Sequence, residues 1–131
     1  MAAIVGTAVA NVDLVKNTAE ELTFTVPVND DATTAGSETF YITPAKRDGE
    51  GVIFINNNCG STVSCTVLGG DFWNNSADMT AFEVATAKIY ALTIDTGKYL
   101  QNTGKIHVKI TPTTTTALTA SNDCTITWLE L

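Results

Sequence analysis

The sequence predicts an all-β fold, a single-domain antiparallel β-sandwich of about eight or nine short strands with at most one short helix. Threonine supplies 23 of the 131 residues, and β-branched side chains fit a pleated sheet better than a helix. Apolar and polar residues alternate along several segments, and turn residues interrupt them about every ten residues. This spacing favours a jelly-roll or an immunoglobulin-like Greek-key sandwich over α/β units.

In the first half of the chain, three strands and a hairpin turn are predicted. Residues 22–26 alternate between apolar residues and threonine, and residues 39–43 restart a strand after a polar loop. Residues 52–55 read Val-Ile-Phe-Ile, a continuous apolar run typical of a strand that is covered on both faces. The Asn- and Gly-rich turn at residues 56–60 then leads to a return strand at 62–68, which predicts a hairpin.

The second half alternates in the same way. Residues 77–86 are the one candidate for a helical turn, and residues 89–94 predict a strand that Asp-Thr-Gly ends. Residues 106–110 form the clearest amphipathic strand. The threonine tract at 111–119 is expected to cross the surface in extended form, and residues 125–131 predict a closing strand.

Length and charge exclude several classes of protein. A chain of 131 residues forms one domain and buries enough surface to fold without a metal ion or a disulfide. The net charge is −7, and the seven cationic residues are scattered, so nucleic acid is not an expected partner. No apolar run is long enough to span a membrane. Residues 1–9 lack the basic start of a signal peptide and predict an N-terminal arm or a first strand.

No residue pattern indicates a metal, a cofactor or a catalytic site. Cys65 and Cys124 each alternate with polar residues in the same way as their apolar neighbours, so both are expected to be buried free thiols. Cys59 lies in a turn and is expected to be exposed. His107 is the one histidine and lies on the polar side of its strand, so we expect a solvated or interface residue. Asp71 and the acids near residue 30 lack calcium-loop spacing and are interpreted as turn residues.

The aromatic pair Phe72 and Trp73 follows two glycines in a predicted loop. Such a pair stacks on sugar rings or fills a pocket in a partner, and aromatic residues in loops also plug the open end of a sandwich. The sequence leaves these interpretations open. Trp128 lies two residues after Ile126, on the same face of the predicted strand, and is expected in the core.

The order of several segments resembles a known family. The segments are Leu-Val-Lys-Asn-Thr-Ala at 14–19, Pro-Ala-Lys-Arg-Asp at 44–48, Val-Ile-Phe-Ile-Asn-Asn at 52–57, the strand that runs into a glycine pair at 63–70, Gly-Lys-Ile-His-Val at 104–108 and Thr-Ile-Thr-Trp at 125–128. Together they are similar to the capsid decoration proteins of tailed bacteriophages, which are also called cement or auxiliary head proteins. The resemblance covers most of the chain and carries no catalytic residues.

This resemblance implies a non-enzymatic β-sandwich that binds the major capsid protein on the outer surface of an assembled shell and stabilises it. Such a protein is made in the host cytoplasm and resides in the virion. We expect a homo-oligomer, with a trimer matching the local threefold positions of a shell. The expected partner interface comprises Ala2, Ala3, Ile4 and Val5 of the N-terminal arm, which would add a strand to a neighbour, together with Phe72 and Trp73.

Two other functions remain open at this point. A carbohydrate-binding or adhesin-like module would use Phe72 and Trp73 as its sugar platform. Another virion component, such as a tail-tube or neck subunit, would assemble into rings or tubes by itself. An enzyme is not expected, because no combination of acid, base and nucleophile occurs in the sequence.

Overall fold

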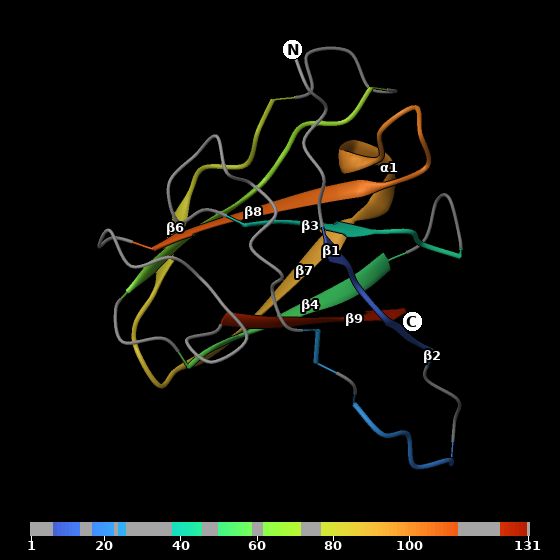
Figure 1. Ribbon diagram of the computed structural model, residues 1–131. Coiled ribbons are helices and arrows are strands. Elements are labelled where there is room, and N and C mark those ends of the chain that lie inside the picture. Colours follow the sequence, from blue (N-terminus) through green and yellow to red (C-terminus); the bar gives the residue numbers. More distant parts are fainter. Residues whose placement is uncertain are drawn as a thin grey trace.

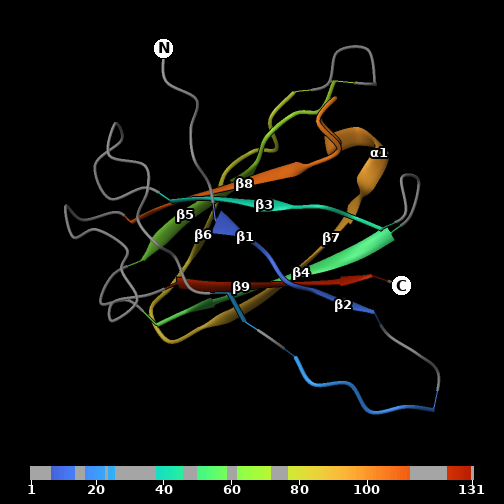
Figure 2. The same ribbon diagram turned by 45° about the vertical axis from the view of Figure 1, so that its right-hand side comes forward.

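The chain forms two β-sheets that pack face to face, as seen in a computed structural model (Figures 1 and 2). The structure describes residues 7–13, 17–22, 24–25, 38–45, 50–58, 62–71, 77–112 and 124–130. These residues contain nine strands and one helix of a single turn. The all-β sandwich that the sequence predicts is therefore confirmed.

One sheet has five strands and the other has four. In spatial order, the five-stranded sheet contains β1 (Thr7–Ala8), β3 (Glu38–Ile42), β8 (Ile106–Pro112), β5 (Val63–Val67) and β6 (Phe82–Val84). The four-stranded sheet contains β2 (Asn11–Asp13), β9 (Cys124–Glu130), β4 (Glu50–Asn57) and β7 (Ile89–Asp95). Most neighbours are antiparallel, but β1 is parallel to β3 and β2 is parallel to β9. The sheets are therefore mixed and not purely antiparallel.

The chain changes sheet at almost every connection. Among the strands of the described residues, only β5 and β6 follow one another within the same sheet. The predicted hairpin between residues 52–55 and 62–68 is therefore wrong, because β4 pairs with β7 and β9 while β5 pairs with β6 and β8. At the end of β4, Asn57 is buried, and its Nδ2 donates to the carbonyl of Val84 at 2.9 Å. This hydrogen bond joins the two sheets where a hairpin turn was expected.

Two further local predictions are wrong. Residues 77–86 form no helical turn but contain β6, and the helix is α1 (Thr96–Tyr99), where a strand stop was expected. Asp95 caps this turn, because its side chain accepts a hydrogen bond from the N–H of Gly97 at 3.0 Å. In the predicted strand at 22–26, the described residues contribute only a bridge between Thr25 and Ile126.

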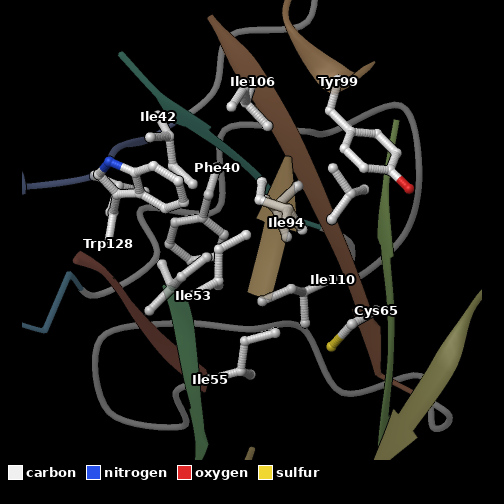
Figure 3. Packing of buried hydrophobic residues seen from close by; sticks show 14 of the residues in the cluster. Phe40, Ile42, Ile53, Ile55, Cys65, Ile94, Tyr99, Ile106, Ile110 and Trp128 are labelled. Atoms are coloured by element: carbon white, nitrogen blue, oxygen red, sulfur yellow. The ribbon is translucent and has the colours of Figure 1, made fainter. Parts of the chain in front are cut away.

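The core lies between the inner faces of the sheets. Strands of both sheets contribute its side chains, including Phe40, Ile42, Ile53, Ile55, Cys65, Ile106, Ile110 and Trp128 (Figure 3). The indole of Trp128 is fully buried, as predicted. It lies against Gly51, where an added Cβ would come within 1.9 Å of the ring. The absence of a side chain at Gly51 is what admits the largest residue of the core.

A buried carboxylate closes one end of this core. Glu130 is 5% exposed, and its Oε1 accepts a hydrogen bond from the indole N–H of Trp128 at 3.0 Å. The same oxygen accepts from the backbone N–H of Ala45 at 2.5 Å. Because Ala45 follows β3, the carboxylate links the ends of the two sheets and satisfies the buried indole donor.

Candidate interaction surfaces

The outer face of the five-stranded sheet is polar. Along β5 and β8, buried apolar residues alternate with half-buried polar ones. The polar residues on these two strands are Ser64, Thr66, His107, Lys109 and Thr111. Beside them, the Nζ of Lys105 lies 4.3 Å from the ring centre of Tyr41 on β3. This face has the regular alternation of a sheet with one buried and one solvated side.

The outer face of the four-stranded sheet is different, because its burial falls steadily across the sheet. Its three cross-strand rows, taken from β9 through β4 to β7, are Leu129, Val52 and Thr93; Thr127, Phe54 and Ala91; and Thr125, Asn56 and Ile89. In every row the β9 residue is buried, the β4 residue is half-buried and the β7 residue is exposed. We call the six outward residues of β4 and β7 the β4–β7 surface. The prediction that both faces of residues 52–55 are covered is therefore met only in part.

The β4–β7 surface presents apolar side chains to solvent. Its apolar members are Val52, Phe54, Ile89 and Ala91. Ile89 is 61% exposed, the largest value among the large hydrophobic residues that the structure describes as exposed. Adjacent apolar residues that remain accessible mark interaction sites more often than isolated ones do. This surface is thus the strongest candidate binding site among the described residues.

One side of the sandwich extends this apolar character. Tyr90 on β7 is 43% exposed, and its ring stacks on that of Phe82 on β6, with centroids 6.5 Å apart and planes 4° from parallel. Met79, Phe82 and Leu92 are partly buried against the core. Since β6 and β7 are the edge strands of the two sheets, these residues cover the open side of the sandwich between them.

The residues of the predicted partner interface lie outside the part of the chain that the structure describes. They are Ala2, Ala3, Ile4, Val5, Phe72 and Trp73. Cys59 and the threonine tract beyond Pro112 also fall outside it. The predictions for these residues therefore stay predictions.

Both ends of the segment that carries Phe72 and Trp73 are firmly anchored. On one side, Gly70 donates its N–H to the carbonyl of Lys98 at 3.1 Å, and an added Cβ there would come within 2.6 Å of two backbone oxygens. Asp71 accepts from the N–H of Asn102 at 2.7 Å through Oδ2. On the other side, the carboxylate of Asp78 accepts from the N–H of Gly69 at 2.8 Å. Backbone and carboxylate hydrogen bonds therefore hold residues 69–71 and Asp78, which flank the aromatic pair in the sequence.

His107 lies on the outer face of β8, as its parity predicts, and is half-buried. Burial lowers the pKa of its imidazole from the ordinary value of 6.5, and the nearby charge of Lys105 lowers this pKa further. The carboxylate of Asp71 acts in the opposite direction. Burial and Lys105 thus favour the neutral imidazole of His107, and Asp71 favours the protonated one. Sequence reasoning missed Asp71 as a neighbour of His107, because the two residues lie far apart in the chain.

Cys65 and Cys124 are both buried, which confirms the predicted burial of these two residues. Burial raises the pKa of the Cys65 thiol to about 12. The thiolate is the reactive form of cysteine, so Cys65 serves as a small apolar residue of the core. Within the described part of the chain, no three His, Cys, Asp or Glu side chains gather as metal ligands do.

No family model, curated protein or solved structure matches this chain. In the described residues, no helix is long and apolar enough to cross a membrane. The class that the fold defines is that of an all-β sandwich. The sequence signal that could have found the β4–β7 surface is the unbroken apolar run at residues 52–55, in which every second side chain must face away from the core.

Proposed function

We propose that this protein is a non-enzymatic structural protein of a phage virion that binds the outer surface of the assembled capsid and stabilises it. The β4–β7 surface is the proposed contact with the major capsid protein. The observation that carries this proposal is the fall in burial from β9 to β7, which leaves apolar side chains accessible on a rigid sheet. The resemblance to capsid decoration proteins supplies the partner.

The physical requirements of such a role agree with the surface. A protein that binds the assembled lattice but not its loose subunits stabilises the shell by mass action. Many equivalent sites lie close together on a shell, so several linked copies gain avidity and each contact can be modest. A small apolar patch around Phe54 and Ile89 is suited to such a contact. The net charge of −7 keeps an abundant protein soluble.

The test is co-sedimentation of the purified protein with bare, expanded phage shells. We expect saturable binding at a copy number set by icosahedral symmetry. Phe54→Thr should weaken binding by about tenfold or more, since it removes the central apolar side chain of the surface. Tyr41→Thr is the matched control, because it removes a half-buried aromatic side chain from the outer face of the other sheet.

The outcomes separate the proposal from its rivals. Equal loss of binding in Phe54→Thr and Tyr41→Thr would contradict the assignment of the contact to the β4–β7 surface. The absence of saturable binding to any shell would contradict the decoration role. The carbohydrate-binding alternative predicts instead that the protein binds glycans and that Trp73→Ala abolishes this binding.

A further inference from the structure

The four sheet edges of the sandwich differ greatly in length. In the part of the chain that the structure describes, three of them are formed by short strands: β1 has two residues, and β2 and β6 have three each. The fourth edge is β7, with seven residues. Proteins protect sheet edges by shortening them, by placing lysine or proline on them or by covering them. β7 is long, contains neither lysine nor proline and is exposed at five of seven positions. Among the described strands, none pairs with its free side.

The hydrogen-bonding groups on the free edge of β7 can be assigned. The N–H of Asn57 donates to the carbonyl of Lys88 at 3.0 Å. The backbone groups of Lys88 therefore point towards β4. In an antiparallel pair the bonded positions alternate, so Tyr90, Leu92 and Ile94 bond to β4. The N–H and C=O groups of Ile89, Ala91 and Thr93 therefore point away from the sheet. They form a template for one more strand.

Charge favours one orientation of that added strand. Lys88 directly precedes β7, and Asp95 ends it. A second β7 in antiparallel orientation brings the cationic end of each copy to the acidic end of the other. A parallel arrangement would instead place like charges together, which is destabilising.

We propose that two copies of this protein associate through β7, with the two strands antiparallel about a twofold axis. The two four-stranded sheets then become one continuous sheet of eight strands. In this pairing, Ala91 lies opposite Ala91 of the second copy, and Tyr90 lies opposite Leu92, an aromatic–aliphatic pair that stabilises a sheet. Asp95 remains beyond the paired apolar segment.

The association goes beyond the proposed role on the shell and does not depend on it. It is isologous and gives a closed dimer, whereas the resemblance to decoration proteins implied a trimer. It also joins the two β4–β7 surfaces edge to edge, so the apolar outer face doubles in width. A dimer can thus be measured in solution with no shell present.

The test is the mass of the full-length protein in solution, measured by sedimentation equilibrium over a wide range of concentrations under reducing conditions. We expect a monomer–dimer equilibrium whose upper mass is twice the 13.9 kDa of the chain. Ala91→Lys and Ala91→Glu each place like charges opposite one another at the twofold axis. Each should raise the dimer dissociation constant about tenfold or more. An equimolar mixture of the two variants should form a heterodimer.

The charge-swap mixture guards against a trivial failure, because a misfolded variant would not regain a partner. Ala8→Lys is the matched control, since Ala8 is an exposed alanine on the short edge strand β1 of the other sheet. It should leave the dissociation constant unchanged. A monomer at every concentration, a trimer, or a dimer that persists in both Ala91 variants would overturn the proposal.

Discussion

The two outer faces of the sandwich follow different rules, although both sheets share one core. On the five-stranded sheet, polar residues such as Ser64, Thr66 and His107 alternate with buried apolar ones. On the four-stranded sheet, β9 is buried at all seven positions while β7 is exposed at five of seven. A solvated face explains the first pattern. The second leaves apolar side chains accessible on β7 and half-buried on β4.

Alternation of buried and accessible residues occurs in both sheets, but we propose that it serves association only in the four-stranded one. On the outer face of the five-stranded sheet, every second residue of β5 and β8 is polar and can contact water. The β4–β7 surface exposes Ile89 and keeps Val52 and Phe54 half-buried, which has a free-energy cost in an isolated monomer and is offset when a partner covers these side chains.

The largest expected effect is on the inner face of the four-stranded sheet. Gly51→Ala places a Cβ within 1.9 Å of the Trp128 ring, whose surroundings are fully packed. We expect a loss of about 3 kcal/mol in the free energy of unfolding, measured by urea denaturation. Ser64→Ala, on the polar outer face, is the control and should change this free energy very little. A stable Gly51→Ala protein would show that the indole has room to move.

The next effect concerns the base of the segment that carries Phe72 and Trp73. In Gly70→Ala the new Cβ meets the carbonyl oxygens of Lys98 and Leu100 at 2.6 Å, and backbone atoms cannot yield as a side-chain tip can. We expect a loss of about 2 kcal/mol in unfolding free energy. If the aromatic pair contacts the partner, shell binding should also weaken. Unchanged stability would mean that α1 is not fixed against Gly70.

A smaller effect on stability is expected at the β4–β7 surface itself. Phe54→Thr removes a half-buried ring but introduces a residue that suits a strand. We expect a loss of about 1 kcal/mol in unfolding free energy, similar to that of Tyr41→Thr on the other outer face. The two variants should differ only in binding. A much larger loss for Phe54→Thr would place its ring in the core and weaken the proposed role of the surface.

The smallest effect is the pH dependence that His107 contributes on the polar face. Its pKa is lowered in the folded protein, mainly by burial, so the unfolded chain takes up a proton at a higher pH than the folded one. The stability that His107 contributes is fully present above pH 6.5, the ordinary pKa of the imidazole in the unfolded chain. It is lost as the pH falls from 6.5 towards the lower pKa of the folded protein. Below that pKa, His107 adds no further pH dependence. His107→Gln should remove this part of the pH profile. An unchanged profile would contradict the burial of the imidazole.

The sequence predicted the strands better than their partners. Alternation identified β3, β5, β7, β8 and β9 and the burial of Cys65, Cys124 and Trp128, because each depends on residues that are close in the chain. The hairpin after residues 52–55 was wrong because the local turn signal does not say which sheet receives the next strand. Its true neighbours, β7 and β9, are far along the chain. The proximity of Asp71 to His107 was missed for the same reason.

The binding site was only partly accessible to sequence reasoning. The run at residues 52–55 indicated apolar character on both sides of β4, but exposure of Ile89 depends on β7 being an edge strand. Pairing order determines which strand becomes an edge, and one sequence does not contain that order in any local pattern. The predicted contacts at residues 2–5 and 72–73 rest on composition alone and still await a test.

Amide hydrogen exchange can show whether the β7 side of the four-stranded sheet is an interaction surface. The amides of Ile89, Ala91 and Thr93 should exchange rapidly in dilute protein, because they point to the free edge. Those of Tyr90, Leu92 and Ile94 should be protected by β4. We predict that the three edge amides become protected when the protein is concentrated enough to associate through β7. Rapid exchange of these amides in the associated protein, with protection elsewhere, would contradict the proposed association through β7.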